Sequence, residues 1–422
     1  MTLPLPPASL LFSPVSVGPL TLHNRVWLPA MVTWLGTDAG DITDHVLSRY
    51  VRYARGGAGM IVVEAMGIRD VASGPLLRIG HDRYIPGLRR LADAVHGAGE
   101  AKVIPQIIDF LKIGRRDPAR ALARLEARYP GCSKWPEEVL SERLTTREYR
   151  DYAYGYRQDI EDLSIEEVRA LPGHFASAAR RARLAGFDGV ELHFAHAYTM
   201  ASFLSATNHR PDEYGGSAAN RVRLAVEVVK AVRAEVGTDF CVGCRILGSD
   251  DVYGGSTLED SRHHATALAK AGVDFISVSR GGRFEDAKRP TVGEAAYPYT
   301  GHSGLMCMPT RDFPDGPNLF LPSAIRRALR ATGLSTPVVG AGKINTYAVA
   351  EGALQSGSLD LVGMARGLLA DPDWPKKVLA GQEEEIRRCK YTNVCESLDR
   401  AHLPVRCQLW MKRPDGGMHP PG

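Results

Sequence analysis

Eight short apolar segments alternate with amphipathic ones along the chain, and this alternation constrains the fold more than any other feature. The segments are apolar throughout, as parallel strands are when both faces of the sheet are covered. Eight strand–helix units predict an α/β fold, the (β/α)8 TIM barrel, over a doubly wound sheet. The predicted strands are 24–33, 59–66, 102–108, 188–192, 240–246, 273–279, 336–341 and 359–364.

Amphipathic periodicity predicts the helices between these strands, at 44–55, 85–98, 165–185, 219–236, 258–271, 322–331 and 346–356, with Asp44 as the N-cap of the first. Two longer segments follow strands three and six. Residues 109–164 are charged and include a helical stretch, and 280–318 are rich in glycine and proline. We therefore expect one barrel domain over residues 1–380 with an insertion at about 109–164. A C-terminal extension, 381–422, contains three cysteines.

Charge and cysteine content exclude several classes of function. The net charge of +4 is spread without a basic block, so no nucleic-acid partner is expected. No apolar run of about 18 residues occurs, which predicts no membrane span. Seven cysteines, an odd number, in a chain without a recognisable secretory signal predict a reducing compartment, and we expect a cytoplasmic protein.

Three proton-donating side chains follow the central predicted strand. His193, His196 and Tyr198 lie within six residues at its carboxyl end, where parallel α/β folds bind their ligands. A lone histidine there would more often be a packed loop residue. Two histidines and a tyrosine so close together favour a catalytic site over packed loop residues.

The segment around these residues carries a longer motif. His193, His196, Tyr198, Phe203-Leu204-Ser205, Asn208, Arg210 and the run 212–217 (DEYGGS) occur in the order and spacing of a known family. This segment resembles the old yellow enzyme family of FMN-dependent ene-reductases, near the 2,4-dienoyl-CoA reductase-like and trimethylamine dehydrogenase-like branch. The resemblance implies an FMN-binding barrel with NAD(P)H as co-substrate.

Two loops at the ends of the last strands suit a phosphate group. Residues 340–343 (GAGK) and 364–367 (MARG) combine small residues with a cation, and barrels often bind phosphate on the backbone N–H groups after these strands. The resemblance assigns the FMN phosphate to Gly342, Lys343, Ala365 and Arg366.

Other strand ends would face the flavin ring. Gln106 and Arg245 close the third and fifth strands, and a fixed guanidinium there can stabilise negative charge on a reduced cofactor. The family uses Gln and Arg at these points, and Ala30-Met31 resembles the backbone segment that contacts the ring. Trp34 stands where relatives often have tyrosine, so we expect it to line the substrate pocket together with His193 and His196.

These residues predict an FMN-dependent oxidoreductase that reduces an activated C=C bond of an α,β-unsaturated carbonyl compound or enoyl thioester. The histidines would hydrogen-bond the carbonyl oxygen, and Tyr198 would donate the proton. The alternatives are a flavin-dependent dehydrogenase or demethylase that runs in the oxidative direction, and a flavin-free phosphate-binding lyase or isomerase. An aldolase would need a Schiff-base lysine on a strand, and the predicted strands carry Lys102 at the opening end. We expect a small-molecule substrate and a homo-oligomer.

The C-terminal extension contains Cys389, Cys395 and Cys407. Relatives with an iron–sulfur cluster carry four cysteines here, and the position of their second cysteine is Thr392 in this chain. A threonine hydroxyl is a hard, weakly basic substitute for a thiolate. We therefore expect no metal site. If a cluster is present, the three cysteines are its ligands.

Overall fold

The computed structural model describes residues 9–70, 74–110, 118–155, 159–284 and 301–410. Eight parallel strands form a closed barrel in which each strand pairs with its neighbours in sequence and the last pairs with the first. This arrangement confirms the predicted (β/α)8 barrel. The strands are β3 (Val26–Leu28), β4 (Met60–Gly67), β5 (Lys102–Ile108), β6 (Gly189–Phe194), β7 (Cys241–Leu247), β8 (Phe275–Ser279), β9 (Val338–Ala341) and β10 (Leu361–Gly363).

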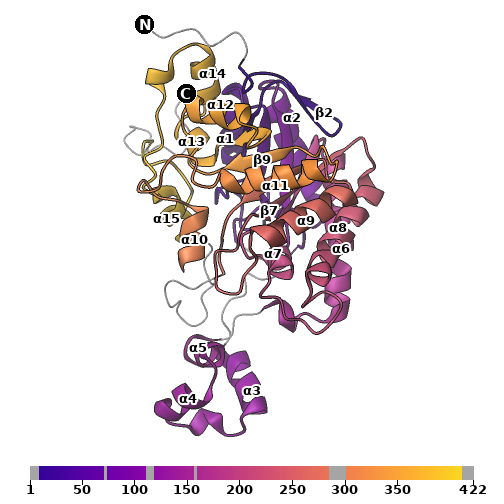
Figure 1. Cartoon of the computed structure of the whole chain (residues 1–422), viewed down its shortest axis with the longest axis vertical. Helices are drawn as coiled ribbons and strands as arrows, with labels where there is room; N and C mark the ends of the chain where they lie inside the picture. Colours follow the sequence, from indigo (N-terminus) through magenta and orange to yellow (C-terminus); the bar gives the residue numbers. More distant parts are fainter. Residues whose placement is uncertain (1–8, 71–73, 111–117, 156–158, 285–300, 411–422) are drawn as a thin grey trace.

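Helices surround the barrel, as Figure 1 shows. The main ones are α1 (Asp44–Arg55), α2 (Ile85–His96), α6 (Ile165–Leu184), α8 (Ala218–Val236), α9 (Leu258–Ala271), α11 (Phe320–Ala331) and α12 (Tyr347–Gln355). Shorter helices are η1 (Asp82–Tyr84), η3 (Ile160–Asp162), α7 (Thr199–Leu204), α10 (Gly301–Cys307) and α13 (Ala365–Ala370). No described helix is long and apolar enough to cross a membrane.

Two local predictions need correction. The first strand is shorter than 24–33 and ends at Leu28, because Pro29 has no N–H for the ladder. Thr43, not Asp44, caps α1: its side chain accepts a hydrogen bond from the Val46 N–H. The glycine-rich segment 280–318 contains helix α10, and residues 285–300 of it lie outside the described part.

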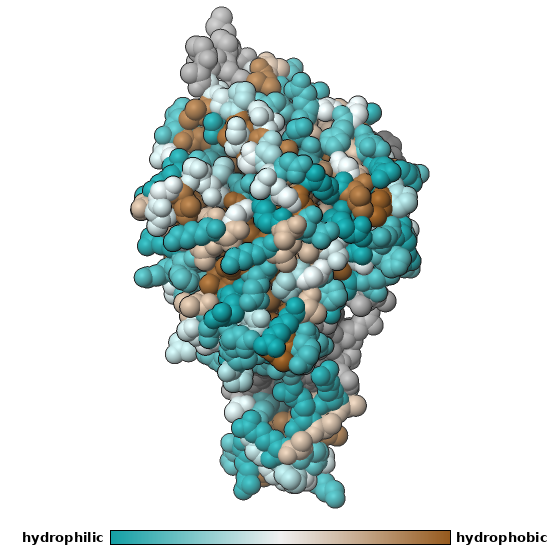
Figure 2. Space-filling view, turned by 90° about the vertical axis from the view of Figure 1, so that its right-hand side faces the viewer, coloured by the Kyte–Doolittle hydropathy of each residue, from teal (hydrophilic) through white to brown (hydrophobic). Residues whose placement is uncertain are grey.

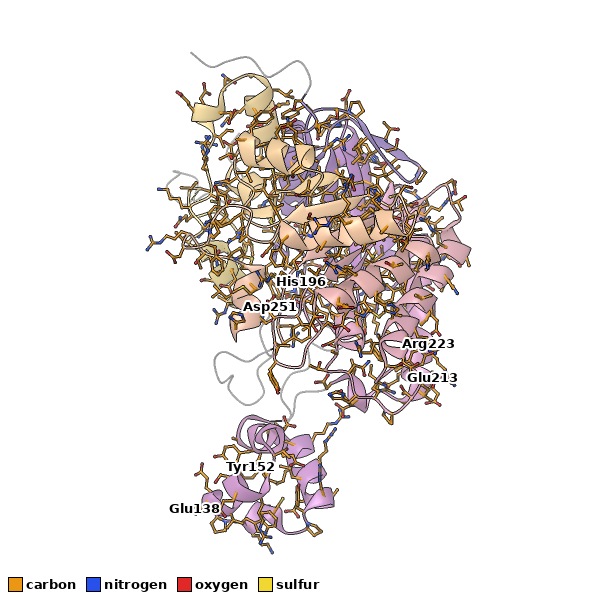
Figure 3. The ribbon with its side chains drawn as sticks, in the orientation of Figure 1. Glu138, Tyr152, His196, Glu213, Arg223 and Asp251 are labelled. Atoms are coloured by element: carbon orange, nitrogen blue, oxygen red, sulfur yellow. The ribbon has the colours of Figure 1, made fainter. Side chains whose placement is uncertain are left out.

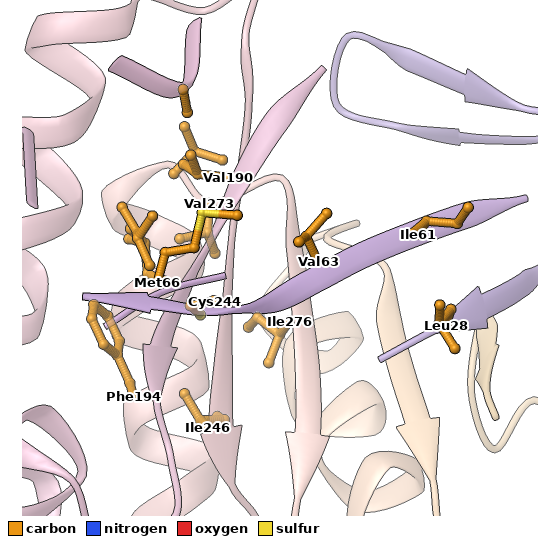
Figure 4. Close-up of a cluster of buried hydrophobic side chains, with 14 of the residues drawn as sticks. Leu28, Ile61, Val63, Met66, Val190, Phe194, Cys244, Ile246, Val273 and Ile276 are labelled. Atoms are coloured by element: carbon orange, nitrogen blue, oxygen red, sulfur yellow. The ribbon is translucent and has the colours of Figure 1, made fainter. Parts of the chain in front are cut away.

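The barrel strands are buried on both faces. On β4, Met60 and Val62 point into the barrel, whereas Ile61 and Val63 point outward to the helices. This alternation follows from the two-residue period of a strand, and Figure 4 shows the outer cluster that results. Both faces are covered, which explains the uniformly apolar strands.

A small hairpin closes the amino-terminal end of the barrel. Strands β1 (Val15–Val17) and β2 (Leu20–Leu22) pair antiparallel, and Gly18 between them has φ of 55°. Val17 and Leu22 pack against side chains inside this end of the barrel, including Trp27 and Phe275. We call this cluster the barrel floor. The rings of Trp27 and Phe275 lie 4.7 Å apart at 63°. No strand was predicted before residue 24, so this hairpin was missed.

The insertion after β5 contains a group of helices: α3 (Pro118–Arg128), η2 (Cys132–Lys134), α4 (Glu137–Arg143) and α5 (Thr146–Tyr154). Their buried side chains form a separate cluster of Leu125, Cys132, Leu140 and Leu144. In Figure 1 these helices project from the barrel. Figure 2 shows a mostly hydrophilic surface on this projection and on the neighbouring barrel face, where hydrophobic residues appear as small separate areas.

The C-terminal extension folds back onto the barrel. It contains α14 (Trp374–Leu379), η4 (Glu383–Glu385) and α15 (Val394–Arg400). The Val405 N–H donates to the Thr33 carbonyl at 2.9 Å, and the Arg49 guanidinium lies 5.0 Å from the centre of the buried Trp410 ring. These contacts hold the extension against the residues that follow β3.

Candidate active site

A cavity of about 460 Å³ opens at the carboxyl ends of the barrel strands. Figure 3 places His196 on the side of the barrel that faces α10 and the projecting helices. All residues predicted for catalysis, cofactor and substrate line this cavity, although they come from distant parts of the chain. They are Ala30, Met31, Trp34, Gln106, His193, His196, Tyr198, Arg245, Gly342, Lys343, Ala365 and Arg366.

His193 lies near the end of β6, and His196 lies in the turn that follows this strand. His196 and Ala197 both have left-handed backbone conformations, with φ of 61° and 60°. Such positions cost about 1–3 kcal/mol each for residues other than glycine. The His196 ring links its neighbours, because Nδ1 lies 3.3 Å from His193 Nε2 and Nε2 lies 2.7 Å from Ser279 Oγ. Strand β6 and the strained turn after it therefore hold the two imidazoles against each other.

Both imidazoles are neutral at physiological pH. Burial lowers the pKa of His193 well below its usual range, and the Arg245 guanidinium lowers it further. Burial also lowers the pKa of His196, with contributions from His193 and Arg245. Neutral imidazoles can still donate an N–H hydrogen bond, which is what a carbonyl oxygen in the cavity would need.

Tyr198 is buried beside the histidines. Its ring lies 5.5 Å from the His193 ring and packs edge-on against Phe110 at 5.8 Å. Burial raises the pKa of Tyr198 to about 12, so the phenol keeps its proton at neutral pH. The side chain is thus a protonated acid beside two neutral hydrogen-bond donors.

Arg245 is paired in register with His193, and its Nη2 lies 3.4 Å from Ser279 Oγ. Within the described part of the chain, its Nε and Nη1 atoms have no hydrogen-bond partner. Glu191, which the sequence analysis missed, accepts a hydrogen bond from Gln106 Nε2 at 2.7 Å. Burial raises the pKa of Glu191, against the opposing effects of Arg245 and Gln106. An acid inside the apolar strand 188–192 was the signal that could have revealed it.

The two loops predicted for phosphate lie side by side after β9 and β10. Gly342 has φ of 124°, and a Cβ there would come within 2.9 Å of the Asn318 amide. The cations of both loops have protein partners. Lys343 Nζ donates to the Arg311 and Phe313 carbonyls, and Arg366 Nη1 donates to the Pro309 carbonyl at 2.9 Å.

Tyr391 of the C-terminal extension lies against both of these cations. Lys343 Nζ is 4.9 Å, and the Arg366 guanidinium carbon 4.8 Å, from the centre of its ring. The extension is therefore part of the wall around the predicted phosphate loops. The sequence analysis did not foresee this role.

The extension also supplies part of the cavity wall around Trp34. Trp34 Nε1 donates to Asp399 Oδ1 at 2.6 Å, and the Trp34 ring lies 4.4 Å from the His402 ring. Burial raises the pKa of Asp399 to about 6, and its hydrogen bond from Trp34 works against that rise. Asp399 and His402 line the cavity together with Trp34.

The three C-terminal cysteines gather in one hydrophobic cluster near Trp34 and Met31. They are free thiols, and burial raises the pKa of both Cys395 and Cys407 to about 11 and raises that of Cys389. In the described ranges, no group of three or more His, Cys, Asp or Glu side chains is arranged to hold a metal ion. The absence of a cluster in the protein stays a prediction.

The cavity fits the flavin that the resemblance implies. Arg245 presents two buried donors without partners, which suits the polar edge of a flavin ring. Gln106, Ala30 and Met31 line the same cavity. Gly342, which has no side chain, lines the cavity together with Ala365 of the second loop, and small residues of this kind let an anion approach backbone N–H groups.

Comparison with known proteins supports this assignment. The family model for the NADH:flavin oxidoreductase / NADH oxidase family matches residues 10–312 and 320–385. A metal reductase of Desulforamulus reducens is 35% identical over 384 residues, which are 90% of this chain and 50% of that protein. An N,N-dimethylglycine/sarcosine dehydrogenase of Chromohalobacter salexigens is 32% identical over 403 residues, 94% of this chain and 52% of that protein.

A solved structure of a 2-naphthoyl-CoA reductase has a TM-score of 0.77 and 25% identity, and the match covers 97% of this chain and 57% of that one. The chain thus spans about half the length of the curated relatives named above. The comparisons confirm the predicted old yellow enzyme resemblance, the enzyme class and the FMN cofactor at the level of the family. This chain belongs to the NADH:flavin oxidoreductase / NADH oxidase family of FMN-dependent oxidoreductases.

Proposed function

We propose that the protein reduces an activated C=C bond conjugated to a carbonyl group, with NAD(P)H as the source of the hydride. One observation carries this proposal: the cavity brings together two neutral imidazoles and a protonated phenol. Such a set can bind a carbonyl oxygen and give one proton without a change of net charge at the histidines.

Each group has a separate task in this reaction. Bound FMN would accept hydride from NAD(P)H and pass it to the β-carbon of the substrate. His193 would donate a hydrogen bond from Nδ1 to the carbonyl oxygen, where negative charge develops, and His196 would do the same once its N–H leaves His193 or Ser279. Tyr198 would give its proton to the α-carbon.

The cofactor would be held by residues from several strand ends, some of them next to the histidines. Arg245 and Gln106 would bind the polar edge of the ring, with the backbone of Ala30 and Met31 beside it. The loops with Gly342, Lys343, Ala365 and Arg366 would bind the phosphate through their N–H groups. Because the Lys343 and Arg366 side chains already donate to backbone carbonyls, we expect their charges to act mainly through the field they create.

A specific observation favours a second candidate, oxidation of an amine. Asp399 and Glu396 line the cavity, and Asp399 accepts a hydrogen bond from the Trp34 indole N–H. Carboxylates together with an aromatic ring suit a cationic substrate. One relative is named as a dehydrogenase of N-methylated glycines. The flavin-free lyase or isomerase is no longer proposed, because the family uses FMN.

The decisive experiment is a half-reaction screen. Purified protein is loaded with FMN, reduced anaerobically with NADH or NADPH, and mixed with cyclic enones, enoyl thioesters or neutral alkenes. Reoxidation of the flavin by conjugated carbonyl compounds supports the proposal. Reduction of the oxidised flavin by N-methylated amines, without reoxidation by any enone, would favour the second candidate.

A further inference from the structure

The loop after β8 packs against the strained turn that carries His196. Gly282 and His196 form a parallel β-bridge, and the Arg283 N–H donates to the His196 carbonyl at 3.4 Å. A Cβ on Gly282 would come within 2.5 Å of His196 Cα, so the approach requires glycine. On its other side, the Gly282 N–H donates to Ser303 Oγ at 2.9 Å. This packing fixes Arg283 relative to the catalytic turn.

Arg283 is 2% exposed, and its guanidinium carbon lies 5.4 Å from the centre of the Tyr198 ring. Of the two residues, Tyr198 lines the cavity and Arg283 does not. A cation at this distance from an aromatic face is attracted to the ring, and more strongly when the ring carries negative charge. A tyrosinate spreads its charge from the oxygen into the ring, which brings that charge toward the guanidinium.

Other groups also face Tyr198. Asp399 of α15 and the Cys307 thiol of α10 lie near enough to affect its charge, and the neutral His193 ring lies 5.5 Å away. Among the groups that affect the pKa of Tyr198, Arg283 is the positively charged one. Its guanidinium lowers the pKa of Tyr198, against the larger effect of burial and smaller effects of Asp399 and Cys307, which raise it.

We infer that Arg283 is a positioning residue for the reaction, whose guanidinium stabilises the negative charge left on Tyr198 when that side chain gives up its proton. This inference rests on the proposed function, in which Tyr198 is the acid. During the step, the O–H bond of Tyr198 breaks and a C–H bond forms at the α-carbon. The hydride at the β-carbon comes from NAD(P)H through the cofactor, and the phenolate recovers its proton from water.

The first test measures the ionisation of position 198 without turnover. A fluorotyrosine is incorporated there in the FMN-loaded enzyme, and its 19F resonance is followed with pH. Loss of the cation in Arg283→Met is expected to move the titration upward by about 1–3 pH units, the range for an opposite charge within about 4–6 Å. Arg283→Lys, which keeps the charge, should move it less. Arg283→Gln serves as a second uncharged variant in case the methionine variant does not fold.

A matched control comes from the same loop. Arg280 forms a bidentate ion pair with Asp251, with both bonds at 2.8 Å, so Arg280→Met disturbs the loop without removing the charge beside Tyr198. We expect an unchanged titration in this control. An unchanged titration in the uncharged Arg283 variants overturns the inference, and so does an equal shift in Arg283→Lys and Arg283→Met.

The second test uses the two half-reactions. Arg283→Met should slow oxidation of the reduced flavin by an enone about tenfold, since a weaker acid transfers its proton more slowly, and leave flavin reduction by NAD(P)H unchanged. In a Tyr198→Phe background, the same substitution should have no further effect. If the rate losses from Arg283→Met and Tyr198→Phe add up in the double variant, the inference is contradicted. A normal enone half-reaction in Tyr198→Phe alone would instead refute the acid role in the proposed function, whatever the titration shows.

Discussion

The replacement Arg245→Met tests the cofactor wall most directly. Arg245 is 8% exposed, and its Nε and Nη1 atoms have no hydrogen-bond partner in the described part of the chain. If both atoms donate to the flavin, methionine removes two hydrogen bonds from a charged group, worth about 1.5–3 kcal/mol each. The total of about 3–6 kcal/mol corresponds to a rise in the Kd for FMN of roughly 10² to 10⁴.

The same substitution should change the protonation of the histidines. Arg245 lowers the pKa of both His193 and His196, so its removal raises both values. Their charged forms would then appear at higher pH than in the parent protein. The cofactor should also become harder to reduce, because the reduced form carries more negative charge. If Arg245→Met weakens binding of the reduced cofactor by about 1.4 kcal/mol more than binding of the oxidised cofactor, the midpoint potential falls by about 30 mV.

The assays are titration of apoprotein with FMN, followed by flavin fluorescence, and a potential measurement on the loaded protein. Arg90→Gln is the matched control, because Arg90 is a surface arginine paired with Asp44. It should bind FMN as the parent does. A Kd within a factor of about three of the parent for Arg245→Met, far below the estimate from two charged hydrogen bonds, would refute the reasoning.

Three further predictions concern other parts of the cavity. Tyr198→Phe should slow the alkene half-reaction by about 10² to 10⁴ and leave reduction by NAD(P)H intact in stopped-flow measurements; equal losses in both would exclude it as the acid. Protein purified without oxygen should contain three titratable thiols at Cys389, Cys395 and Cys407 and no stoichiometric iron, whereas iron with a broad visible absorbance would make them ligands. Asp399→Asn should stabilise the protein by up to about 3 kcal/mol above pH 7, because burial raises the pKa of Asp399 to about 6 and ionising it in the folded state costs free energy. This gain should disappear below about pH 4, where the carboxyl is protonated in both states, and a melting-temperature difference that does not change with pH would contradict it.

The barrel could be predicted because its signals are local. Apolar segments of five to ten residues and helices with regular periodicity mark each unit in the sequence, and the candidate site residues follow from their places at strand ends. The resemblance of the segment around His193, His196 and Tyr198 to a known family predicted the cofactor and the type of reaction. All predicted site residues do line one cavity, although their individual roles stay predictions.

The missed features depend on contacts between distant segments. Nothing near Asp399 or Tyr391 in the sequence indicates that α15 and its preceding loop would lie against Trp34 and the phosphate loops. Arg283 is similar: its significance depends on the ring of Tyr198, which is 85 positions earlier in the chain. The hairpin at 15–22 did leave a signal, since alternating residues flank a Gly-Pro pair, but strands of three residues are too short to identify by periodicity.

The hairpin covers one end of the barrel, and the cavity opens at the other end. Substitutions at these two ends should have different effects. Trp27 and Phe275, covered by Val17 and Leu22, lie at the opposite ends of the strands from His196 and Arg245. Substitutions at the floor should therefore reduce the yield of folded protein while the surviving molecules keep their normal turnover per flavin. In a deep mutational scan that scores abundance and activity separately, the two ends of each strand should fall into different phenotypic classes. Directed evolution of a new substrate range could then concentrate its libraries on the cavity end, with the floor as a source of compensating stability.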